Sequence, residues 1–166
     1  EYALQFAETG HLCMATLHAN NANQAIDRVI NFFPEERRSQ TLMDLGMNLR
    51  AMVSQRLIPK KGGGRVPAIE ILINTPLVSD KILKGETLDL KEVMKKSRES
   101  GMITFDESLY QLYKSGQISF EDGYRNADSA NEYRLKVKLD SAGAGEDAQN
   151  TATADTPQEE VKFKII

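Results

Sequence analysis

His11 begins the apolar segment HLCMATL and His18 directly follows it, and these are the two histidines of the chain. An imidazole can donate a hydrogen bond to a phosphate oxygen and so respond to a bound nucleotide. His18 is followed by Asn20 and Asn21 and then by a predicted helix, whose free N–H groups and dipole could attract an anion. The same residues could instead form a plain loop and cap the helix, and the spacing alone leaves both interpretations open.

The segment from His11 to Leu17 predicts a strand buried on both faces, as in a parallel sheet. Open α/β sheets bind ligands at the carboxyl ends of their strands, which is where His18 would lie. Because side chains alternate along a strand, the odd separation of the two histidines directs them to opposite faces, so we do not expect them to share a metal ion. Cys13 is expected to be buried and unreactive. As the only cysteine, it excludes a disulfide framework and a cysteine-rich metal site.

Helices and a hairpin are expected around this strand. The first nine residues read as a helix already under way, with Gly10 as its stop, so we expect sequence upstream of this chain. Asn21 is a suitable cap for the helix that follows it. The glycine-rich sequence KKGGGR indicates an antiparallel hairpin, since a phosphate-binding loop would need a lysine followed by Ser or Thr. The predicted elements are helices at Ala22–Phe33 and Glu35–Gln55 and strands near Arg56–Pro59 and Val66–Ile73.

The second half of the chain has a helical pattern. Helices are predicted at Thr75–Gly85, Leu88–Ser100 and Thr104–Gly116, followed by two short helices that Ser119 and Ser129 cap and that reach Leu139. Residues 140–166 carry six acidic side chains and two lysines and are predicted to be a disordered acidic tail, with no specific role for its final VKFKII. We therefore expect an α/β unit at residues 1–74, a helical unit at 75–139 and the tail at 140–166.

Charge and hydropathy exclude several classes of protein. The formal net charge is −3, of which the tail contributes −4, so the rest of the chain is close to neutral. A dedicated nucleic-acid-binding protein would have a basic face, so no nucleic-acid partner is expected. The sequence has neither a signal peptide nor an apolar span long enough for a membrane helix, so no direct membrane insertion is expected.

Three ordered segments of the chain resemble one known family. These are ETGHLCMATLHANNANQAIDRVINFFPEERR, SQRLIPKKGGGRVPAIEILINTP and SGMITFDESLYQLYKSGQIS. Together they resemble the PilT/PilU family of type IV pilus retraction ATPases, within the secretion ATPases of the GspE/PilT superfamily. The resemblance covers roughly residues 1–139 and is strongest to the PilU type. It implies the C-terminal part of a RecA-like P-loop ATPase domain with a partial sheet, followed by a helical C-terminal region.

The resemblance also implies an activity, partners and site residues. Members of this family are expected to be homohexamers at the cytoplasmic face of the inner membrane that hydrolyse ATP with Mg²⁺ to retract pili. A PilT-like paralogue and an inner-membrane pilus platform protein are the implied partners. His11 and His18 match the family's histidine box, with His18 the better candidate for contact near the terminal phosphate. Thr16, Asn20 and Asn21 belong to the same region and are implied nucleotide contacts, while Ala19 replaces the threonine often found there.

Several absences refine this expectation. The four-cysteine zinc insertion typical of pilus assembly and type II secretion ATPases cannot form with Cys13 alone, which favours the retraction branch. LVSDKI at Leu77–Ile82 stands where PilT has AIRNLI, which indicates an accessory motor of the PilU type. The family's Walker A lysine, Walker B segment and catalytic glutamate have no counterpart here, so this piece alone is not expected to hydrolyse ATP. The alternatives are a non-enzymatic interaction module of the pilus motor, with His18 only structural, and a pilus assembly or type II secretion ATPase.

Overall fold

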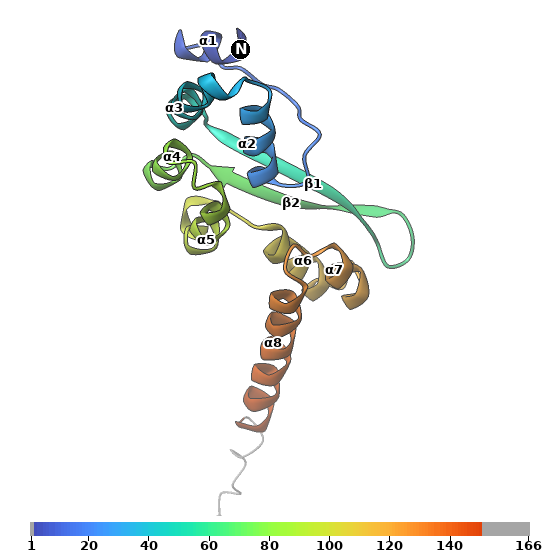
Figure 1. Cartoon of the computed structure of the whole chain (residues 1–166). Coiled ribbons are helices and arrows are strands. Elements are labelled where there is room, and N and C mark those ends of the chain that lie inside the picture. Colours follow the sequence, from blue (N-terminus) through green and yellow to red (C-terminus); the bar gives the residue numbers. More distant parts are fainter. Residues whose placement is uncertain (1, 151–166) are drawn as a thin grey trace, which may run out of the picture.

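A long β-hairpin crosses the middle of the molecule and helices pack against it at both ends (Figure 1). The structure is a computed structural model that describes the backbone of residues 2–150 and the side chains of residues 2–141. The helices are α1 Tyr2–Glu8, α2 Ala22–Asn31, α3 Arg38–Asn48, α4 Pro76–Leu83, α5 Leu90–Lys96, α6 Phe105–Lys114, α7 Phe120–Asn126 and α8 Ala130–Asn150. The strands are β1 Ala51–Pro59 and β2 Arg65–Ile73, and short 3-10 helices lie at Glu35–Arg37, Thr87–Asp89 and Arg98–Ser100. None of the described helices is both long enough and apolar enough to cross a membrane.

The hairpin and most of the helix starts agree with the sequence-based predictions. β1 and β2 pair antiparallel from Ala51 opposite Ile73 to Pro59 opposite Arg65, and the glycines of KKGGGR form the turn with positive φ angles. Side-chain caps begin four of the helices, since each cap oxygen accepts a hydrogen bond from a first-turn N–H; the caps are Asn21, Thr75, Thr104 and Ser119. After α1, Gly10 at φ 89° ends the helix, with Gly10 N bonded to Ala7 O and His11 N to Phe6 O.

Three predictions about the elements are wrong. Residues 11–19 form neither strand nor helix, because a strand buried on both faces needs a hydrogen-bonded neighbour at each edge, and the two described strands pair only with each other. The predicted helix Glu35–Gln55 ends at Asn48, and its last residues belong instead to β1, where pairing with β2 outweighs a helical pattern. Helix α8 continues to Asn150, past the expected start of the tail, and residues 151–166 with VKFKII lie outside the described residues.

Two apolar clusters occupy opposite ends of the inner face of the hairpin. The first joins β2 to α2, α3, α4 and α5 through Ala22, Ile26, Ile30, Leu45, Leu72, Val78, Ile82, Leu90, Val93, Met94 and Met102. The second joins the hairpin to α6 and α8 through Ile58, Ala68, Phe105, Leu109, Tyr110, Ile118 and Tyr133. Between the clusters the inner face carries polar side chains, Ser54 and Arg56 on β1 and Glu70 on β2. The polar middle of the hairpin is therefore where the two packed groups of helices meet.

Glu70 is the fully buried carboxylate of this polar middle, with 1% of its surface exposed. Its Oε1 accepts a 2.8 Å hydrogen bond from Ala22 N, the first N–H of α2. Its Oε2 has no hydrogen-bond partner among the described residues. Burial raises the pKa of the Glu70 carboxyl above its ordinary value, although the bond from Ala22 N opposes this effect. Glu70 thus fixes the start of α2 to β2 through the bond from Ala22 N, while burial disfavours the charged form of its carboxyl.

The contact between α7 and α8 has no spare room. An added Cβ at Gly123 would lie against Tyr133 Oη and 2.5 Å from Tyr133 Cζ. Tyr133 is 1% exposed, and its hydroxyl has no partner among the described residues. Burial raises the pKa of Tyr133 to about 12. The absence of a side chain at residue 123 is therefore what allows the Tyr133 ring to enter the second cluster.

The first prediction concerns this contact. Gly123→Ala should destabilise the fold by about 1–3 kcal/mol, because the methyl group overpacks the site. Tyr133→Phe should be neutral or stabilising by up to about 1 kcal/mol, because it removes a buried hydroxyl that makes no hydrogen bond. Urea denaturation followed by circular dichroism measures both free energies of unfolding. A Gly123→Ala variant as stable as the parent would contradict the close contact.

The second prediction concerns the pH dependence that Glu70 gives to stability. A raised folded-state pKa means that the carboxyl stabilises the fold below its unfolded pKa, and that this contribution is lost as pH rises through the folded pKa. The parent should therefore lose stability relative to a Glu70→Gln variant between pH 4 and pH 8. Urea denaturation across that range measures the difference.

The control for this experiment is Glu92→Gln. A hydrogen bond from Lys95 lowers the pKa of Glu92, so its contribution to stability has the opposite pH dependence and is weakened by solvent exposure. If the difference between parent and Glu70→Gln were constant across the pH range, or grew in favour of the parent, the assigned direction of the Glu70 pKa would be wrong.

Candidate functional site

The segment that carries both histidines is extended and exposed. Leu12 and Met14 are 81% and 90% exposed, although such side chains usually pack into an interior. Cys13 is also exposed, so the prediction that it is buried is wrong, while its lack of reactivity stays a prediction. The cause is the same as for the missing strand, because within residues 2–141 no sheet covers this segment. An apolar extended segment without neighbours has surface available for a further part of the protein.

His11 and His18 have different surroundings. His11 Nδ1 lies 3.0 Å from Thr9 Oγ1, and its ring meets the ring of Phe6 edge to face at 5.9 Å. His11 is therefore held by the end of α1. His18 and Thr16 are exposed and make no hydrogen bond to any residue that the structure describes. The structure thus attaches His11 to α1 and leaves the imidazole of His18 accessible.

Asn21 is a helix cap whose side chain is fully used. Its Oδ1 accepts a 3.0 Å hydrogen bond from Gln24 N, and its Nδ2 donates at 3.3 Å to Asp128 Oδ2. With Ala22 N bonded to Glu70, two of the first three N–H groups of α2 already have partners. The start of α2 is therefore occupied by protein groups, one of them a carboxylate, and it does not offer a free anion site. Direct nucleotide contacts by Asn20 and Asn21 remain predictions.

Arg56 connects the histidine segment to the C-terminal helices. Its Nη1 donates at 2.8 Å to Asn126 O at the end of α7, and its Nη2 donates at 3.1 Å to Asn20 O. The same Nη2 lies 2.5 Å from Asp128 Oδ1, and the guanidinium lies over the ring of Phe105 at 4.0 Å. Only an arginine has a planar fork that can reach three acceptors while stacking on an aromatic ring. Arg56 thereby fixes the backbone at Asn20, two residues after His18.

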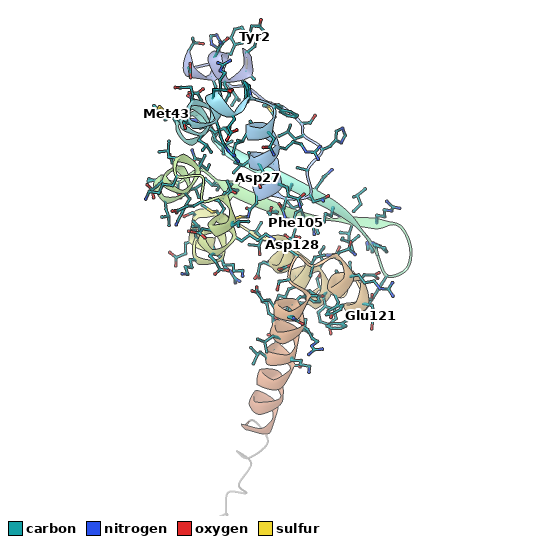
Figure 2. The ribbon with its side chains drawn as sticks, in the orientation of Figure 1. Tyr2, Asp27, Met43, Phe105, Glu121 and Asp128 are labelled. Atoms are coloured by element: carbon teal, nitrogen blue, oxygen red, sulfur yellow. The ribbon has the colours of Figure 1, made fainter. Side chains whose placement is uncertain are left out.

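Asp128, which Figure 2 labels, is the carboxylate on which these contacts converge. It accepts hydrogen bonds from Arg56 on β1, Lys91 on α5 and Asn21 at the start of α2, and its side chain is 11% exposed. Burial raises the pKa of the Asp128 carboxyl, but the bonds from Lys91 and Arg56 lower it by more, so its pKa lies below the ordinary value. We call Asn21, Arg56, Lys91 and Asp128 the Arg56–Asp128 junction.

A second carboxylate holds the backbone of the junction. Asp106, in the first turn of α6, accepts hydrogen bonds from Asp128 N at 2.7 Å and from Ser129 N at 3.1 Å. These two N–H groups lie directly before α8, where a carboxylate also interacts favourably with the helix dipole. Asp106 therefore fixes the connection between α7 and α8, and with it the position of the Asp128 carboxylate.

The surface cleft beside the junction has paired charges. It lies between α5, α6 and α8, and residues including Lys91, Lys95, Asp106, Asp128 and Glu132 line it. Lys91 pairs with Asp128, and Lys95 pairs with both Glu92 and Glu132. Such a cleft indicates neither an anion nor a cation as its ligand. Within residues 2–141 no group of three or more His, Cys, Asp or Glu side chains lies close enough together to hold a metal ion.

The junction was not predicted from the sequence. The sequence pattern places Arg56 at the start of a predicted strand. It gives no signal at Asp128, which precedes the predicted cap Ser129. The only local signal was Glu70, a charged residue inside the apolar strand sequence VPAIEILI. A charge at an inward position of a strand indicates a buried polar partner. The identity of the partners required the fold, because Arg56 and Asp128 are far apart in the sequence.

Comparison with known proteins gives the family. Residues 1–121 match the family described as Type II/IV secretion system protein. The chain is 58% identical to the type IV pilus ATPase PilU of Pseudomonas aeruginosa over 142 residues, which is 85% of this chain and 37% of PilU. It is 39% identical to the type IV pilus retraction ATPase PilT of the same organism, over 75% of this chain and 36% of PilT.

The fold agrees with that of a solved relative. The crystal structure of the pilus retraction motor PilT with bound ADP matches with a TM-score of 0.70 and 37% identity, covering 79% of this chain and 36% of that one. The chain therefore spans little more than a third of the length of these relatives. The predicted α/β class, as the C-terminal part of such an ATPase, is confirmed. Because the family match spans most of the chain, the chain belongs to the Type II/IV secretion system protein family, and PilU and PilT are among the proteins that it resembles.

Proposed function

We propose that this chain is the C-terminal part of a PilU-like type IV pilus retraction ATPase, in which ATP hydrolysis drives pilus retraction and twitching motility. The observation that carries the proposal is the 58% identity to PilU over 85% of the chain. The fold match to PilT, a motor crystallised with ADP, supports the use of an adenine nucleotide. The full-length protein is the proposed enzyme, and the chain alone, without Walker A and Walker B segments, is proposed to be inactive.

The exposed histidine segment is the proposed contribution of this chain to the nucleotide site. Leu12 and Met14 are apolar, extended and uncovered, as expected for a strand whose neighbours belong to another part of the full-length protein. Added neighbours would place His18 at the carboxyl end of a central strand, where its accessible imidazole could donate to the terminal phosphate. Thr16 would contribute a hydroxyl from the same segment. His11, held by Thr9 and Phe6, would act at the other end of the segment.

ATP and Mg²⁺ are the proposed cofactors, and this chain is proposed to contribute side chains that contact the nucleotide. His18 and Thr16 are accessible side chains that fit contact with phosphate oxygens. No group of three or more metal-ligating side chains lies together among the described residues, so we derive no step through the metal from this chain. The role of this part of the protein is therefore to orient a histidine toward the nucleotide, not to neutralise its charge.

The retraction branch is favoured over pilus assembly and type II secretion because one cysteine cannot form the zinc site of those ATPases. In α4, Val78 and Ile82 are buried, as the apolar positions of the corresponding PilT motif would be. Ser79 and Asp80 replace its arginine and asparagine. Ser79 Oγ donates at 2.6 Å to Gly46 O of α3, and Asp80 pairs with Lys84. Both side chains are therefore bonded to residues of this chain, whereas an arginine and an asparagine at these positions could bind a partner. This difference favours an accessory motor.

The proposed assembly is a homohexamer at the cytoplasmic face of the inner membrane. It would act with a PilT-like paralogue and with the inner-membrane pilus platform protein, and without nucleic acid. An interaction module in which His18 has no role in catalysis is the alternative from a different class. The two functions differ in what loss of the His18 imidazole would do to ATP turnover.

The third prediction separates them. In the full-length protein, His18→Ala should lower kcat for ATP hydrolysis by about tenfold or more, because hydrogen bonds placed to meet charge in a transition state are worth at least that much. The melting temperature should stay within a few degrees, because His18 is exposed and makes no bond within the described residues. Steady-state phosphate release and thermal denaturation measure the two effects.

Two further variants serve as comparisons. Gln40→Ala removes an exposed side chain that is hydrogen-bonded to Asp44 on the same helix, and should leave kcat unchanged. His11→Ala tests the second histidine, and a larger loss there than for His18→Ala would transfer the phosphate contact to His11. Full turnover by His18→Ala would support the interaction module.

A further inference from the structure

We infer that Asp128 is a positioning residue for the ATPase site: together with Arg56 and Asn21 it ties the histidine segment to the C-terminal helices, so that the place of those helices sets the place of His18. This inference rests on the proposed function, since it requires His18 to act on the nucleotide. It assigns to the connection between α7 and α8 a role in turnover, although that connection makes no hydrogen bond to His18 or Thr16.

The first argument is convergence. The Asp128 carboxylate receives donors from three separate elements: β1, α5 and the residue that caps α2. Asn21 donates to Asp128 with one side-chain atom and caps α2 with the other. Three donors on one mostly buried carboxylate define its position from three directions, so none of these elements can shift alone without breaking a charge-assisted bond.

The second argument is the backbone contact of Arg56. The guanidinium binds Asn126 O at the end of α7 and Asn20 O in the histidine segment. It also pairs with Asp128 through the same Nη2 that reaches Asn20 O. The carbonyl of residue 20 and the connection before α8 are therefore held by one rigid planar group, and His18 lies two residues upstream of that carbonyl.

The third argument is that the connection before α8 is itself fixed. Asp106 of α6 accepts from the N–H groups of Asp128 and Ser129. Below the junction, Glu70 of β2 binds the first N–H of α2. A displacement of α6 or α8 would thus move the Asp128 carboxylate, and through Arg56 and Asn21 it would move residues 20 and 21. Small errors in the placement of a contact group can lower turnover by about 100-fold.

The test is a double-mutant cycle in the full-length ATPase with His18→Ala and Asp128→Asn. Asp128→Asn keeps the size of the side chain and removes the charge that Arg56 and Lys91 bind. We expect it to lower kcat about tenfold with a smaller change in KM for ATP, and to cause no further loss in the His18→Ala background, since a residue that acts through His18 has nothing to position there. Hydrogen exchange should be faster in peptides covering residues 11–24.

The matched control is Asp89→Asn, which removes an exposed carboxylate that pairs with Lys81 and not with a residue of the junction. It should leave kcat and the exchange of residues 11–24 unchanged. Thermal denaturation monitors folding of every variant. If Asp128→Asn does not fold, Arg56→Lys replaces it in the same cycle, because lysine keeps the charge but cannot bind Asn20 O, Asn126 O and Asp128 together.

The outcomes separate the inference from the proposed function. Loss of turnover in His18→Ala, together with full turnover in Asp128→Asn, would overturn the inference and leave the proposed function intact. Equal fold-losses from Asp128→Asn in both backgrounds would also overturn it, because Asp128 would then act independently of His18. Full turnover in His18→Ala would overturn both. The inference is supported if Asp128→Asn lowers turnover only when His18 is present and makes hydrogen exchange faster at residues 11–24.

Discussion

The arrangement of this chain depends on how the charge of Arg56 is satisfied. Arg56 points inward from β1, in the middle of a hairpin face that is apolar toward both ends. The side chains of Arg56 and Asp128 are only 22% and 11% exposed, and a guanidinium largely withdrawn from water is tolerated only when its donors are bonded. Its acceptors come from Asn20 and from the pair Asn126 and Asp128, which belong to two distant parts of the sequence. Satisfying one side chain therefore determines where the histidine segment ends and where α8 begins.

The same polar middle explains how the two apolar clusters are held in a fixed relative position. The first cluster packs α2 to α5 on one end of the hairpin, and the second packs α6 and α8 on the other. Hydrophobic contact is non-directional and would allow the two groups of helices to slide or rotate relative to each other. Directional bonds from Glu70, Arg56, Asp106 and Asp128 fix their relation at the boundary. Each cluster also combines residues from both sides of residue 74, so the hairpin contributes to both packed groups.

The sequence predicts correctly those features that depend on neighbouring residues. Caps such as Asn21 and Thr104, and the glycine turn between the strands, need only residues a few positions away. The apolar pattern from His11 to Leu17 predicts a strand. A strand needs neighbouring strands to bond with, and the described residues do not provide them for this segment. The sequence from Leu49 to Val53 fits a helical face and a strand equally well, and pairing with β2 decided it. The Arg56–Asp128 pair joins residues far apart in the sequence and produces no periodic pattern, so the sequence does not predict it.

The start of α2 finally bears on how a phosphate could be recognised here. A helix N-terminus attracts anions when its N–H groups are free. In this chain Glu70 and the Asn21 side chain bind two of the first three N–H groups, and the carboxylate of Asp128 lies beside them. The positive end of the helix dipole therefore already faces protein acceptors, and a phosphate placed there would compete with two carboxylates. If this chain contacts a phosphate as proposed, the contact would come from accessible side chains before the helix, and the His18 imidazole is exposed and makes no hydrogen bond to any described residue.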